Sequence, residues 1–63
     1  MYVSVGRIPD GGLVKWVVWE ELYISSAGIL SDRFVGAYTL GIYRKWIQEQ
    51  HIELENLSEN RPV

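Results

Sequence analysis

The fold is decided near the N-terminus by residues 3–19, which read VSVGRIPDGGLVKWVVW. At the start of this stretch apolar and polar side chains alternate, which is the pattern of a half-buried strand. Residues 9–12 read PDGG, where proline presets a turn, aspartate bonds its own backbone and glycine tolerates positive φ. Residues 13–19 are rich in β-branched and aromatic side chains, which favour a strand. Two such runs around a glycine-containing turn predict a β-hairpin.

The second strand of this hairpin is apolar on both faces. Val14, Trp16 and Val18 share one face, because side chains alternate along a strand. Val17 and Trp19 share the other. A strand of this kind is either covered on both sides or lies in an interface between molecules.

The next segment, residues 20–35, is compatible with two structures. Its two leading glutamates suit the N-terminus of a short helix closed by Gly28, since carboxylates there meet the positive end of the helix dipole. A strand that continues through residues 22–24 suits the sequence equally, and a turn would then lead into a third short strand. The sequence leaves this choice open.

The C-terminal half shows helical periodicity from Gly36 to Leu57. Thr39 or a residue near Ser31 can serve as the N-cap. The late part of the pattern has no glycine that would stop a helix. The apolar face of this predicted long amphipathic helix carries Leu40, Tyr43, Trp46, Ile47, Leu54 and Leu57.

These elements predict an α+β fold class: an N-terminal β-hairpin, with room for a third short strand, packed against a long C-terminal amphipathic helix. We expect residues 1–57 to form a single small domain. Residues 58–63 are expected to be a disordered tail, because Pro62 cannot continue a helix and termini fray.

Composition narrows the classes of protein that this chain can belong to. Its 63 residues are 48% hydrophobic, which is too apolar for a disordered chain. It has no cysteine, which excludes disulfides and thiolate metal sites. No apolar run approaches the roughly 20 residues of a membrane span. The N-terminus lacks a basic stretch followed by an apolar one, so we expect no secretory signal and a cytoplasmic protein.

The sequence offers no constellation of catalytic residues. Two glycine pairs have P-loop spacing, but neither is followed by the Lys and Ser/Thr that phosphate and magnesium need. His51 is the only histidine, and a transition-metal site needs three or four converging ligands. No Gly-x-Ser-x-Gly elbow surrounds a serine. We therefore predict no enzymatic activity, no catalytic residue, no metal site and no cofactor.

Eight aromatic residues are many for so small a chain. Most of them are expected in the core, but one hairpin and one helix cannot cover them all. We predict that Trp19, Tyr23 and Tyr38, together with Ile42, form a partner-binding surface, since Trp and Tyr are enriched at interface hot spots. The predicted function is that of a small regulatory protein that binds a protein partner and forms a homo-oligomer. By analogy, small phage and plasmid inhibitors and adaptors are often of this kind.

A second function comes from residues 43–52, which read YRKWIQEQHI. This segment resembles the recognition-helix end of winged-helix excisionases, although an acidic tail stands where those proteins carry their wing. The resemblance implies a small DNA-binding regulator in which Arg44 and Lys45 face DNA and Trp46 lies in the core. Arg33 would join them on the nucleic-acid surface. The net charge of −2 works against such binding at long range.

Overall fold

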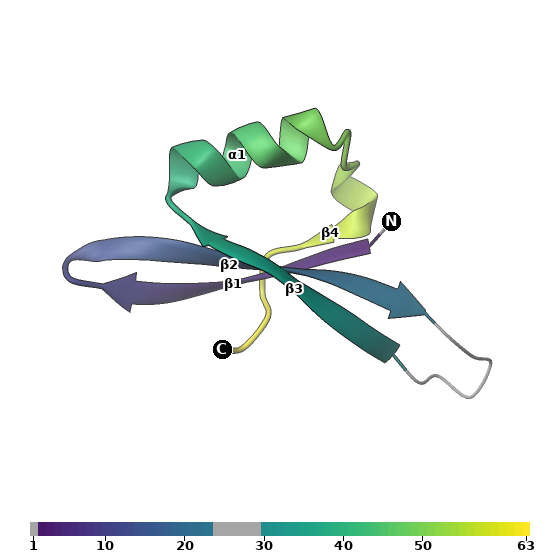
Figure 1. Ribbon diagram of the computed structural model, residues 1–63, viewed down its shortest axis with the longest axis horizontal. Coiled ribbons are helices and arrows are strands. Elements are labelled where there is room, and N and C mark those ends of the chain that lie inside the picture. Colours follow the sequence, from purple (N-terminus) through teal and green to yellow (C-terminus); the bar gives the residue numbers. More distant parts are fainter. Residues whose placement is uncertain (1, 24–29) are drawn as a thin grey trace.

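The computed structural model describes residues 2–23 and 30–63. Its first two strands, β1 (Tyr2–Asp10) and β2 (Leu13–Tyr23), pair antiparallel over their whole shared length (Figure 1). Gly11 and Gly12 connect them with φ values of 58° and 87°. Two successive positive φ angles are what a two-residue hairpin turn requires, and glycine adopts them without steric cost.

Two further strands complete a sheet of order β3-β2-β1-β4. β3 (Leu30–Tyr38) pairs antiparallel with β2, with an irregularity between Val18 and Trp19. β4 (Leu57–Ser58) is short and runs parallel to β1. β2 is therefore a central strand, which explains why it is apolar on both faces.

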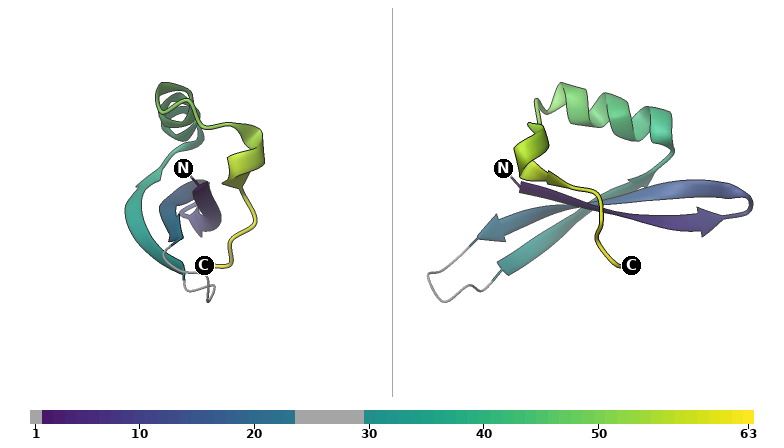
Figure 2. Two further views of the ribbon diagram at one scale, coloured as in Figure 1. Left: turned by 90° about the vertical axis from the view of Figure 1, so that its right-hand side faces the viewer. Right: turned by 180° about the vertical axis from the view of Figure 1, so that it is seen from behind.

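One helix, α1 (Leu40–Glu49), lies across one face of the sheet (Figures 1 and 2). Tyr43 points from this helix into the sheet, where it is buried with Val3, Val5 and Val18. These three valines come from neighbouring positions of β1 and β2 on the helix side. The core is small, and half-buried side chains such as Trp16, Trp46 and Leu57 enlarge it at the margins.

The predicted fold class is wrong, because residues 30–63 contain no long C-terminal helix and the sheet formed by the described residues has four strands. Of the segment with helical periodicity, only the ten residues of α1 form an α-helix. Residues 36–38, expected at the start of the helix, belong to β3. After α1 the chain forms the short 3-10 helix η1 (Leu54–Asn56) before it enters β4.

The helix ends early because His51 adopts a left-handed conformation, with φ of 56°. The amide of His51 donates to the carbonyl of Gln48, and the amide of Ile52 donates to the carbonyl of Ile47 at 3.2 Å. This is the Schellman pattern, which usually has glycine at the left-handed position. Histidine is one of the few other residues that occur there, so the sequence carries only a weak stop signal.

The middle segment is a strand where the structure describes it. Residues 20–23 continue β2, and β3 resumes at Leu30. Of the two alternatives, the short helix that would begin at the two glutamates is therefore wrong at its start. The expected turn and closing Gly28 lie outside the described residues.

The C-terminal segment crosses to the sheet face opposite α1 (Figure 2). The amide of Arg61 donates to the carbonyl of Val5 at 3.1 Å, beyond the end of β4. Its guanidinium donates to Ser4 Oγ at 3.0 Å and to Asp32 at 2.5 Å, and lies 4.0 Å from the centroid of the Trp19 ring. We call residues 61–63 the C-terminal strap. With α1 on one side and this strap on the other, both faces of β2 are covered.

Candidate functional site

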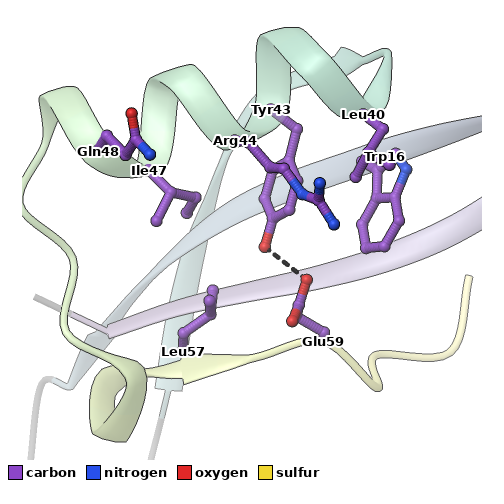
Figure 3. A pocket seen from close by; sticks show the side chains of 8 residues that line it. All are labelled: Trp16, Leu40, Tyr43, Arg44, Ile47, Gln48, Leu57 and Glu59. Atoms are coloured by element: carbon purple, nitrogen blue, oxygen red, sulfur yellow. Dashed lines mark hydrogen bonds between the residues drawn. The ribbon is translucent and has the colours of Figure 1, made fainter.

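The site that stands out is an open groove between α1 and the β1–β2 hairpin. It consists of two adjoining hollows of about 310 and 330 Å³, and Trp16 and Leu40 line both. We call the whole the Trp16 groove. The first hollow is further lined by Tyr43, Arg44, Ile47, Gln48, Leu57 and Glu59 (Figure 3). The second is further lined by Arg7, Leu13, Val14 and Thr39.

The Trp16 ring is held in place by its neighbours. It stacks on Tyr43 with the ring centroids 5.0 Å apart and an interplanar angle of 8°. The guanidinium carbon of Arg7, directly opposite on β1, lies 5.4 Å from the centroid of the same indole. Offset aromatic stacking and a cation near an aromatic ring are both favourable. A ring fixed in this way loses little further freedom when a ligand packs against it.

Across the first hollow the Tyr43 hydroxyl donates a hydrogen bond to Glu59 Oε2 at 2.9 Å (Figure 3). Burial raises the pKa of Tyr43 well above its usual value, and the hydrogen bond to Glu59 and its negative charge raise it further. Tyr43 therefore keeps its proton throughout the physiological range. This pair links α1 to the segment after β4 and is not suited to proton transfer near neutral pH.

The outer part of the groove is apolar and open to solvent. Leu13 is 64% exposed and Leu40 is 38% exposed, and Val14 lies exposed between them and Trp16. Neighbouring exposed apolar side chains beside a hollow mark a binding site better than scattered ones do.

The groove also carries two arginines. Arg7 lines the second hollow and Arg44 the first. Within residues 2–23 and 30–63 neither forms an ion pair. Their positive charge is therefore available to an acidic ligand that enters the groove.

The residues predicted to bind a partner are not brought to one surface. Trp19 lies on the face opposite α1, half-buried beneath the strap and edge-on to Phe34. Tyr38 is half-buried against the core, and a side chain on Gly36 would collide with its ring. Ile42 is exposed on α1. The side chain of Tyr23 lies outside the described part of the chain.

The residues predicted for nucleic acid are also separated. Arg33 on β3 forms an ion pair with Glu20 at 2.7 Å. Arg44 belongs to the Trp16 groove, and Lys45, the next residue along α1, is exposed but does not line the groove. One of these three cations is thus already paired with an acid of the sheet.

Sequence reasoning missed the residues that build the groove, namely Arg7, Leu13, Val14 and Leu40. The apolar second strand and the excess of aromatics were the available signals. Both signals indicated more apolar surface than the core can bury. They did not show where this surface lies, because the groove forms only where α1 lies against β2. In the sequence 23 residues stand between Trp16 and Leu40, and nothing local marks the two as neighbours.

Among residues 2–23 and 30–63, no three acidic or histidine side chains gather as a metal site would require. No helix of this described part is long and apolar enough to cross a membrane. Comparison of the chain with protein-family models, with curated proteins and with solved structures finds no match.

Proposed function

We propose that this chain is a small interaction protein that acts by binding and not by catalysis, and that its binding site for a protein partner is the Trp16 groove. The observation that carries the proposal is the pairing of a fixed tryptophan with exposed apolar side chains beside it, Leu13, Val14 and Leu40. Tryptophan in a desolvated pocket is a frequent hot spot of protein interfaces.

The chemistry of the groove indicates the kind of segment that fits. Its apolar floor suits one or two aliphatic or aromatic side chains of a partner. Arg7 and Arg44 stand at its two hollows and favour carboxylates next to that anchor. The preferred ligand is therefore a short peptide segment with an apolar anchor and flanking acidic residues.

Selection from a displayed library of random peptides tests this proposal. The selection uses the wild-type chain and two variants, Leu40→Glu in the groove and Leu22→Glu at the far end of β2. Leu22 is the matched control, because it is 49% exposed and does not line the groove. Both variants are first checked for folding by circular dichroism.

The expected outcome is a set of acidic peptides with an apolar anchor that bind the wild type and the Leu22→Glu variant but lose binding to Leu40→Glu. Binding that survives Leu40→Glu, or a selection that enriches no peptide, contradicts the proposal. A titration with duplex DNA that shifts the amides of Arg44 and Lys45, and weakens steeply with salt, would favour the nucleic-acid function instead.

A further inference from the structure

The chain carries, at the other end of α1, a segment with the chemistry that the Trp16 groove selects. Leu54 is 84% exposed, more than any other large apolar residue of the described chain. Its sequence neighbours are Glu53 and Glu55, both exposed and neither in an ion pair with a described residue. We call residues 53–55 the Leu54 knob.

The backbone of the knob is held by hydrogen bonds from the two residues that follow it. The amide of Asn56 donates to the carbonyl of Glu53 at 2.9 Å, and the amide of Leu57 donates to that of Leu54. Just outside the knob, Ile52 and Leu57 pack against the core. Leu54 is thus presented outward by a fixed backbone, which lowers the entropy lost on binding.

Leu54 lies remote from the Trp16 and Leu40 end of the groove in its own molecule. Leu40 lies at the start of α1, and the knob follows the end of this ten-residue helix. A helix of this length spans about 15 Å. In Figure 3, η1 lies beside one end of α1, and Trp16 and Leu40 lie towards the other end. Any partner of this kind for the groove must therefore come from another molecule.

We infer that a second copy of this chain occupies the Trp16 groove, with Leu54 of each copy seated beside Trp16 of the other and with Glu53 and Glu55 facing Arg7 and Arg44. This inference rests on the proposed function, since it names one occupant of the same groove. A two-fold axis perpendicular to α1 exchanges knob and groove, so both contacts form together and the assembly closes as a dimer.

The interface is small and the dimer correspondingly weak. The described chain exposes 4598 Å², and a stable standard interface needs about 800 Å² from each partner. Each copy contributes only its three-residue knob and its groove, and we expect these to bury less than that. The dimer therefore forms only at high protein concentration. An acidic peptide that binds the groove more tightly displaces the second copy, so self-association and partner binding compete.

Sedimentation equilibrium from micromolar to millimolar concentration tests the dimer. The wild-type mass should rise from 7.3 kDa towards twice that value. Leu54→Ala should raise the dissociation constant at least about tenfold, because each dimer loses two buried leucines. Leu22→Ala, which truncates an exposed leucine remote from the knob, should leave it unchanged.

A charge exchange provides the sharper test. One variant carries Glu53→Lys and Glu55→Lys, and the other carries Arg7→Glu and Arg44→Glu. Each alone should stay monomeric, because like charges meet in both contacts of its homodimer. An equimolar mixture should recover the dimer, since both contacts of the heterodimer are complementary. For the wild type, a nuclear Overhauser contact between Leu54 methyls of one copy and the Trp16 indole of another checks the same pairing without any substitution.

A wild type that stays monomeric at every concentration overturns the inference. The inference is also overturned if Leu54→Ala leaves the dissociation constant of the dimer unchanged. The same holds if the mixture of the two charge variants stays monomeric although both are folded. Peptide selection on Leu54→Ala separates the two proposals. If this variant binds acidic peptides while the wild type never dimerises, the function stands and the inference falls. If the wild type dimerises through Leu54 while no peptide binds the freed groove, the inference stands and the proposed partner binding falls.

Discussion

Removal of the half-buried Arg61 side chain should destabilise the fold more than removal of any other cationic side chain. Three contacts disappear in Arg61→Ala: the hydrogen bond to Ser4 Oγ, the ion pair with Asp32 and the stacking over the Trp19 ring. The backbone bond from the Arg61 amide to Val5 does not depend on the side chain.

The magnitude follows from these contacts. A net hydrogen bond contributes about 1 kcal/mol. An ion pair as exposed as that with Asp32 adds about 0.5 kcal/mol after solvent screening. The cation over Trp19 adds about 0.5 to 1 kcal/mol. We therefore expect a loss of about 2 kcal/mol, which in a domain of this size lowers the melting temperature by roughly 10 °C.

Urea unfolding followed by far-ultraviolet circular dichroism measures this loss. The matched control is Arg33→Ala, which removes one ion pair of a guanidinium that is 68% exposed and should cost less than about 1 kcal/mol. Arg61→Lys keeps the charge but loses the forked geometry, so its free energy of unfolding should lie between those of the wild type and Arg61→Ala. If Arg61→Ala costs no more than Arg33→Ala, the strap does not stabilise the sheet.

Iodide quenching of Trp19 should increase in Arg61→Ala alone. Backbone relaxation of residues 58–63 in the same samples tests the predicted disorder of the tail.

Four further substitutions, one of them a control, test the backbone and the core. His51→Gly should raise the free energy of unfolding by about 1 kcal/mol, because glycine adopts the left-handed conformation without strain, and a loss of stability on urea unfolding would contradict this role of position 51. Gly6→Ala should lower the free energy of unfolding by about 2 kcal/mol, since a Cβ there meets the Val63 side chain and lies 2.8 Å from the carbonyl oxygen of Arg61. Gly41→Ala is its control, because open space surrounds position 41 and alanine in the helix should gain about 0.5 to 1 kcal/mol. The folded state holds the Tyr43 proton more tightly than the unfolded state, because burial raises its pKa, so stability should be full below pH about 10 and fall above it. Tyr43→Phe should flatten this alkaline decline, and an unchanged decline would contradict the assignment.

The hairpin could be predicted from the sequence because its causes are local. Gly11 and Gly12 supply the two positive φ angles of the turn, and the β-branched and aromatic residues on either side favour strands. The apolar character of β2 on both faces likewise predicted that the strand is covered on both sides or lies in an interface. Neither inference depends on residues distant in the chain.

The candidate site depends on contacts between distant residues, and the sequence could not place it. Trp16 and Leu40 become neighbours only when α1 packs on the sheet, and the surface predicted from Trp19 and Tyr38 is divided between the two faces of that sheet. The excess of aromatics indicates more apolar surface than a small core can bury. The hydrophobic effect is not directional, however, so the sequence does not say which ring stays at the edge of the core.

The amino-acid sequence alone determined the N-terminal hairpin, its turn and the two-sided apolar character of its second strand, because turn chemistry and side-chain alternation act over a few residues. Only the tertiary structure decided where the helix stops, that β4 pairs with β1 and that Arg61 reaches the far face. Helical periodicity continues past Glu49 in the sequence, but packing of Ile47, Ile52 and Leu57 against the core favours a left-handed residue at His51 over another helical turn. This tertiary choice turns the chain back to the sheet, leaves Leu54 exposed and opens the groove beside Trp16.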